Sequence, residues 1–185
     1  MVGTPIFDEL RELFATSPDR FGSRPQAEGS PGPSRPPTKV IITGGPGAGK
    51  TTFVGSVSDT HPITVEAATD FGRITLNPDL VLYLFGTSKP EHAAFAGALG
   101  AVVLVDPRRI EDAFPTINYF ENGSDIPFVV AVNMFVGGLV YDLDELREAL
   151  ALDPRVPLMT CDAREPRSAA KVLQNLITHT LNIAP

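Results

Sequence analysis

The segment Gly44–Thr51 constrains this chain more than any other feature of its sequence. It is GGPGAGKT and matches the pattern G-x-x-x-x-G-K-[ST] at every fixed position. The apolar run at 39–43 predicts a buried strand before it, and residues 50–58 predict a helix after it. Such a strand, glycine-rich turn and helix N-terminus place backbone N–H groups around phosphate oxygens. A glycine-rich turn that holds no ligand is the alternative, and the full match favours a phosphate-binding loop.

Two side chains of this loop carry the chemistry. Lys50 would reach the β- and γ-phosphates of a nucleotide, and the Thr51 hydroxyl would ligate Mg²⁺. The motif does not distinguish GTP from ATP, or binding from turnover. The residues predicted to bind phosphate are Gly44, Gly45, Pro46, Gly47, Ala48, Gly49, Lys50, Thr51 and Thr52.

The rest of the chain alternates apolar runs with helical patterns. Continuously apolar strands between helices are typical of a mainly parallel sheet covered on both faces. We therefore predict an α/β fold of the P-loop NTPase type, in which a hairpin around 77–79 adds one antiparallel edge strand. Strands are predicted at 39–43, 63–76, 80–85, 101–105, 127–132 and 156–160, and helices at 50–58, 108–120 (disturbed by Pro115), 143–150 and 167–181.

The N-terminal part differs in composition from the rest. Residues 1–37 predict a short amphipathic helix at 6–15 followed by a linker rich in Pro, Gly and Ser, and the folded domain spans 38–185. So short a helix needs a surface on which to dock. Its own domain and a partner protein both remain open as that surface.

Charge and composition exclude several classes of function. A net charge of −7 opposes nucleic-acid binding. The single cysteine, Cys161, rules out an internal disulfide framework, and the three histidines show no metal-ligand spacing. Because no signal peptide and no transmembrane run are recognisable, we expect a cytoplasmic protein.

Asp106 has two interpretations. It ends an apolar strand, as the carboxylate of an ATPase or kinase would, and such an enzyme would use Asp106 to support its metal. It also precedes Pro107, a pattern typical of a helix N-cap with proline at the first helical position.

Several segments, the loop included, match a known family, and they lie at 39–58, 70–76, 82–87, 100–106, 128–133 and 162–164. In these segments the chain resembles the bacterial Ras-like GTPases of the conservon type, an ATP/GTP-binding family related to the gliding-motility Ras-like GTPases. The resemblance implies a Ras-like fold, GTP or GDP as ligand, a roadblock-type regulatory partner and signalling beside a sensor-kinase-like protein. Peripheral membrane association would come only through such partners. The resemblance also disfavours a metal role for Asp106.

The resemblance also implies a base site, from which this chain departs. The base would be met by Asn133, Asp162, Ala163 and Arg164, whereas Asp162 and Arg164 otherwise suggest an ordinary loop ion pair. Val136 replaces the acid that would accept the guanine N–H groups, so guanine selectivity should fall. Asp142 or Asp144 could compensate from the following loop.

Both segments that would contact the terminal phosphate also depart from the family pattern. Glu66 stands in the place of a threonine, Lys89 replaces a glycine, and the water-positioning glutamine is absent. Glu91 or His92 would have to position water instead, although both are also typical of a solvated helix start. We therefore predict weak or absent hydrolysis.

Three functions follow from this. The first is a GTP-binding Ras-like protein in a bacterial signalling complex. The second is a pseudo-GTPase that serves as an interaction module without turnover. The third is an ATPase or kinase that uses Asp106.

Overall fold

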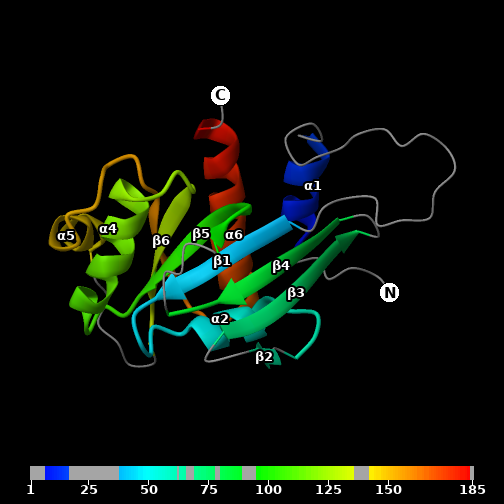
Figure 1. The fold of residues 1–185 in the computed structure, drawn as a ribbon, viewed down its shortest axis with the longest axis horizontal. Coiled ribbons are helices and arrows are strands. Elements are labelled where there is room, and N and C mark those ends of the chain that lie inside the picture. The colour runs from blue at the N-terminus through cyan, green and yellow to red at the C-terminus, as the bar shows by residue number, and fades with distance from the viewer. Residues whose placement is uncertain are drawn as a thin grey trace, which may run out of the picture.

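The computed structural model describes residues 7–16, 38–61, 63–65, 69–77, 80–88, 95–135 and 142–183. Figure 1 shows a twisted sheet with helices on both of its faces. The strands are β1 (Thr38–Gly44), β2 (Ile63–Val65), β3 (Thr69–Asn77), β4 (Leu80–Gly86), β5 (Ala98–Val105), β6 (Phe128–Asn133) and β7 (Leu158–Cys161). The helices are α1 (Asp8–Thr16), α2 (Lys50–Val57), η3 (Ile110–Ala113, a 3₁₀ helix), α4 (Phe114–Asn122), α5 (Leu143–Ala149) and α6 (Pro166–Ile183).

The sheet has seven strands in the order β2-β3-β4-β1-β5-β6-β7. Neighbouring strands from β4 to β7 pair in parallel, and β3 pairs antiparallel with both β4 and β2. The predicted mainly parallel α/β fold is confirmed. The antiparallel strand β3 is not at the edge, however, because the predicted strand at 63–76 contributes two separate strands, and the shorter one, β2, lies outside it.

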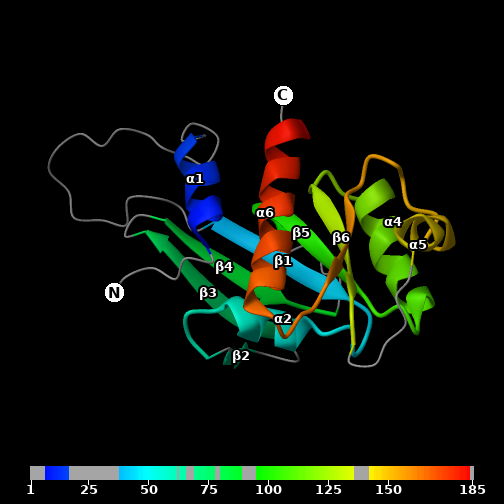
Figure 2. The ribbon, with the colours of Figure 1, turned by 180° about the vertical axis from the view of Figure 1, so that it is seen from behind.

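Each face of the sheet is covered by its own group of helices. Helices α1, α2 and α6 pack on one face with inward residues such as Val40 and Ile42, and Figure 2 shows α6 crossing that face. On the other face, Ile41 and Val103 pack with residues of α4 and α5. Since β1, β5 and β6 are covered on both faces, they are apolar along nearly their whole length, as a parallel sheet requires.

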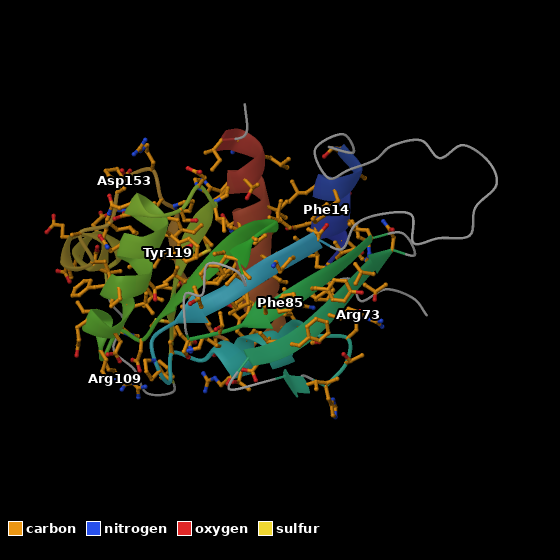
Figure 3. All side chains as sticks on the ribbon, viewed as in Figure 1. Phe14, Arg73, Phe85, Arg109, Tyr119 and Asp153 are labelled. Carbon is orange, nitrogen blue, oxygen red and sulfur yellow. The ribbon has the colours of Figure 1, made fainter. Side chains whose placement is uncertain are left out.

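Helix α1 docks on its own domain, which answers the question left open by the sequence. Leu10 and Phe14 are buried in the core that includes α6, and Arg11 donates to the backbone carbonyl of Leu76 on β3. Figure 3 labels Phe14 on α1 beside the sheet. The predicted linker lies, at 17–37, outside the described residues.

The prediction of a helix at 108–120 is wrong for the first part of that range. Residues up to Arg109 form a turn, a 3₁₀ helix spans Ile110–Ala113, and α4 begins only at Phe114. Pro115 lies in the first turn of α4, where its missing N–H has no intrahelical partner to lose, so proline starts this helix instead of disturbing it. The other predicted helices are confirmed within two residues at each end.

The topology brings the predicted site residues to one edge of the sheet. Because β1, β5, β6 and β7 are parallel, the segments that follow them meet at the carboxyl edge, where open α/β sheets bind their ligands. Strand β3 runs in the opposite direction and therefore begins at this edge, where Asp70 pairs with Gly86. Figure 3 shows Arg109 at the same end of the sheet.

Candidate functional site

The loop between β1 and α2 has the backbone that the motif predicts. Gly49 precedes α2 with φ of +103°, a left-handed conformation that favours glycine. A Cβ at Gly49 would also collide with the amide of Asn133. No side chain of the described residues caps the start of α2, so its first N–H groups remain available to an anion.

Lys50 lies folded back across this loop. Its Nζ donates to the carbonyl oxygens of Gly44 at 3.0 Å and Gly45 at 2.7 Å. The side chain is buried, and burial lowers the pKa of the ammonium group below its ordinary value of 10.5, while the charge of Asp70 opposes that shift. A buried cation whose hydrogen bonds go to neutral carbonyls is suited to an arriving phosphate, because the phosphate would compensate its lost hydration.

Thr51 meets an acid that the sequence analysis did not assign to the site. Its hydroxyl donates to Oδ2 of Asp70, with 2.5 Å between the oxygens. Asp70 is buried and lies at the start of β3, 19 residues along the chain. The signal available in the sequence was its place in a segment that matches the family pattern, but the contact itself depends on how β3 pairs with β4.

The side-chain oxygen atoms of Thr51 and Asp70 are suitable ligand atoms for a magnesium ion. A hydroxyl and a carboxylate are oxygen ligands of the kind that Mg²⁺ prefers, and Mg²⁺ in nucleotide sites takes few protein ligands because phosphates and water supply the rest. Among the described residues there is no group of three or more His, Cys, Asp and Glu able to hold a metal. The site therefore fits a metal that arrives with a nucleotide and does not fit an all-protein metal centre.

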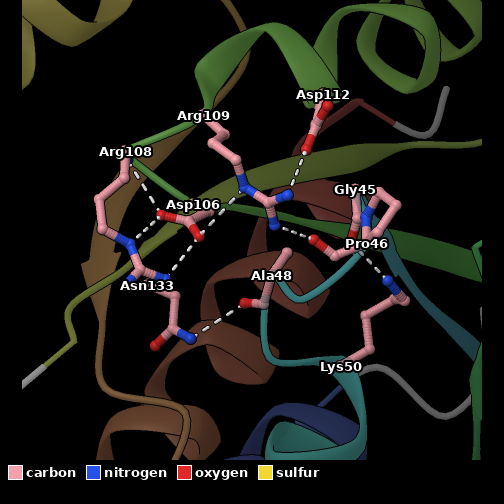
Figure 4. A network of polar contacts seen from close by, with 9 residues as sticks. All are labelled: Gly45, Pro46, Ala48, Lys50, Asp106, Arg108, Arg109, Asp112 and Asn133. Atoms are coloured by element: carbon pink, nitrogen blue, oxygen red, sulfur yellow. Dashed lines mark hydrogen bonds and ion pairs between the residues drawn. The ribbon is translucent and has the colours of Figure 1, made fainter.

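Asn133 joins three parts of the site. It ends β6, is buried, donates through Nδ2 to the carbonyl of Ala48 at 2.9 Å, and accepts from the Ala163 amide at 3.0 Å. The first contact holds the phosphate loop to β6, and the second holds the loop after β7. Figure 4 shows the first contact. In this structure Asn133 positions the two loops, and the amide of Ala163 that was expected near the base is paired with Asn133.

Asp162 and Arg164 form the loop ion pair that the sequence suggested. Nη2 of Arg164 lies 2.6 Å from Oδ2 of Asp162, and Nε lies 2.8 Å from Oδ1. This contact lowers the pKa of the Asp162 carboxyl. Both side chains are partly exposed, and they precede and follow Ala163 in the chain.

Asp106 is buried and paired with arginine. Its Oδ1 accepts the Arg108 backbone N–H at 3.0 Å, and its two oxygens receive Nε and Nη2 of the Arg108 guanidinium at 2.9 and 2.7 Å. The Arg108 contact lowers the pKa of Asp106, against the effect of burial. The carboxylate therefore caps a backbone N–H, as the capping interpretation expects. The segment that it caps is a turn, however, and not the predicted α-helix. The oxygens of Asp106 are occupied by arginine, which opposes a metal role.

Several predicted residues cannot be placed. Glu66, Lys89, Glu91, His92 and Val136 lie outside the described residues. Of the acids considered as substitutes at the base, Asp142 caps α5 by accepting the backbone N–H of Asp144 at 2.7 Å. Asp142 therefore has a structural role.

Two further findings concern the described structure outside this site. A cavity of about 500 Å³ lies between α5, β7 and α6, and none of the predicted site residues lines it. Across the described part of the chain, no helix is long and apolar enough to cross a membrane.

Comparison with known proteins shows the fold. The sequence matches no protein-family model and no curated protein. The structure is similar to the G domain of the T. maritima FeoB iron transporter, with a TM-score of 0.57 and 15% identity over 78% of this chain and 98% of that chain. The FeoB G domain from Methanococcus jannaschii gives a TM-score of 0.56 at 15% identity, over 78% and 97% of the two chains.

A third similar structure is a mutant of S. thermophilus NFeoB bound to GDP, with a TM-score of 0.57 and 20% identity. This likeness covers 80% of the present chain and 65% of that one. All three identities are low, so the comparison establishes that this chain shares the P-loop fold of these G domains and establishes nothing finer.

Proposed function

We propose that this chain binds GTP or GDP with Mg²⁺ and acts as a Ras-like nucleotide-binding protein in a bacterial signalling complex. The observation that carries the proposal is the junction at Asn133, which ties the phosphate loop through Ala48 to the loop at Ala163. A glycine-rich turn between a strand and a helix does not by itself require a ligand. A buried amide that joins the phosphate loop to the two segments on its base side supports a site built for a whole nucleotide.

The residues around the loop have separate roles in nucleotide binding. The N–H groups at the start of α2 and the Lys50 ammonium would hold the phosphates. Thr51 and Asp70 would hold Mg²⁺, which neutralises phosphate charge when it is bound. The likeness to FeoB G domains and to an NFeoB mutant bound to GDP supports a guanine nucleotide.

The base site supports only weak selectivity for guanine. Val136, an apolar residue at the place of the acceptor, cannot pair with the guanine N–H groups, and Asp142 is engaged at the start of α5. We therefore expect GTP to be preferred over ATP by less than in a protein with a complete acceptor. The missing glutamine supports weak or absent intrinsic hydrolysis.

The other functions are less well supported. A pseudo-GTPase module agrees with the departures in sequence, but one of its expected docking parts, α1, is packed on its own domain. An ATPase or kinase using Asp106 is opposed by the pairing of that carboxylate with Arg108. The roadblock-type and sensor-kinase-like partners are proposed from the sequence resemblance.

Binding by the Lys50→Ala variant tests this function. We expect the wild type to bind a fluorescent GTP analogue in Mg²⁺ and Lys50→Ala to lose most of that affinity, because it removes the buried cation. Lys171→Ala, on the exposed side of α6, is the matched control and should bind as the wild type does. Equal binding by Lys50→Ala and wild type would contradict the proposal. Retention of a partner by a Lys50→Ala variant that no longer binds nucleotide would favour the interaction module.

Hydrolysis is a separate test. In a single-turnover assay without any partner, we expect GTP to remain largely intact over a time in which an ordinary Ras-like protein would hydrolyse it. Hydrolysis at an ordinary Ras-like intrinsic rate would contradict this part of the proposal.

A further inference from the structure

The turn after β5 connects two segments of the nucleotide site through two adjacent arginines. Arg108 is held by both oxygens of Asp106, and its guanidinium carbon lies 3.9 Å from the centre of the Phe135 ring, two residues beyond Asn133. Arg109 turns the other way, toward the phosphate loop, as Figure 4 shows. The same turn therefore reaches both the base side and the phosphate side.

Arg109 touches the phosphate loop directly. Its Nη2 donates to the Pro46 carbonyl oxygen at 2.5 Å, a contact between residues 63 positions apart in the chain. The guanidinium also lies against Gly47, which has φ of +74°, and a Cβ there would be 3.0 Å from Nη2. The Arg109 side chain is 49% exposed, so its charged end lies between the loop and solvent.

The two arginines differ in how far their charge is neutralised. The carboxylate of Asp106 meets Arg108 at 2.7 Å but Arg109 only at 3.9 Å. The nearest carboxylate to Arg109 among the described residues is that of Asp112, at 3.5 Å, which is longer than a charge-assisted hydrogen bond. The short contact of Arg109 is thus with a neutral carbonyl, and its positive charge is less fully compensated than that of Arg108.

We propose that Arg109 binds the terminal phosphate of the nucleotide, as a cation supplied by the same chain. The inference rests on the proposed function, because it needs a nucleotide at the phosphate loop. A planar guanidinium with several donors matches phosphate oxygens better than a carbonyl does. The backbone N–H groups of such a loop cradle the α- and β-phosphates, and side-chain cations reach the terminal phosphate. Pro46, which Arg109 contacts, belongs to that loop. Exchange of the Pro46 contact for a phosphate oxygen needs only rotation of the partly exposed side chain.

The test compares GTP with GDP in variants of Arg109. Arg109→Gln keeps a donor for the Pro46 carbonyl but removes the charge, and Arg109→Lys keeps the charge without the planar group. Arg155→Gln removes an exposed arginine that is paired with Asp153, outside the site, and serves as the matched control. Arg108→Gln removes a charge from the same turn but not from the phosphate loop. The dissociation constants of each variant for GTP and GDP are measured with Mg²⁺ at two salt concentrations.

We expect Arg109→Gln to weaken GTP binding by about tenfold or more and GDP binding by less than about threefold, as loss of one charged hydrogen bond to the third phosphate predicts. Its GTP affinity should also depend less on salt, and Arg109→Lys should recover much of the GTP affinity. Arg108→Gln should change both nucleotides alike. Equal effects of Arg109→Gln on GTP and GDP, or no effect on either, would overturn the inference. If neither wild-type protein nor any variant binds nucleotide, the proposed function itself has failed.

Discussion

Replacement of Asn133 by alanine should destabilise the nucleotide-free protein. The change leaves two backbone groups without their partner: the Ala48 carbonyl and the Ala163 N–H, at residues that are each 1% exposed. An unpaired buried polar group costs roughly 1–3 kcal/mol, so the pair should cost about 2–6 kcal/mol. For a domain of this size, that loss lowers Tm by about 4–24 °C.

The assay is thermal unfolding of the nucleotide-free protein, with urea unfolding to give the free-energy difference. Asn122→Ala is the matched control, because Asn122 makes a side-chain hydrogen bond of similar length to Asn118 on the exposed surface of α4. It should change the stability by less than about 0.5 kcal/mol. A Tm for Asn133→Ala within about 1 °C of the wild-type value would refute the claim that Asn133 holds the two loops together.

Three other substitutions or treatments test separate parts of the structure. Asp70→Asn should weaken GTP binding by about tenfold or more in Mg²⁺ but far less in EDTA, since its carboxylate contacts Thr51; equal losses in titrations under both conditions would contradict a role with the metal. Burial raises the pKa of the Cys161 thiol to about 11, so below that pH the group stays neutral and iodoacetamide should modify it slowly at pH 8 until urea unfolds the chain. Rapid labelling of the folded protein, followed by mass spectrometry, would show that this residue is accessible. Leu10→Ala should cost about 2–4 kcal/mol in urea unfolding, and the partly buried Leu13→Ala less, because Leu10 is 1% exposed in the core under α1; a cost below about 0.5 kcal/mol would mean that α1 is not docked.

Local sequence was sufficient to predict the glycine-rich turn between β1 and α2 and the central strands. The GGPGAGKT segment specifies its own turn, and strands such as β5 and β6 are apolar on both faces because helices cover both. The strand predicted at 63–76 could not be divided from its pattern alone, since nothing in its apolar residues marks where β2 ends and β3 begins.

Contacts between distant segments were beyond prediction from local pattern. Asp70 reaches Thr51 only because β3 begins at the carboxyl edge of the sheet, which follows from its pairing with β4. Arg109 reaches Pro46 because the turn after β5 lies beside the loop after β1, a consequence of strand order. The resemblance in sequence had assigned Asn133 to the base, whereas its hydrogen bonds show that it also holds two backbone loops in place.

The most direct test of the account is calorimetric titration of the nucleotide-stripped protein with GTP, GDP and ATP, each in the presence of Mg²⁺. We expect GTP and GDP to bind at one site per chain, and ATP to bind more weakly by only a modest factor because Val136 cannot pair with guanine. Absence of binding by all three nucleotides, in protein shown to be folded, would contradict the claim that the loop at Gly44–Thr51 is a nucleotide site.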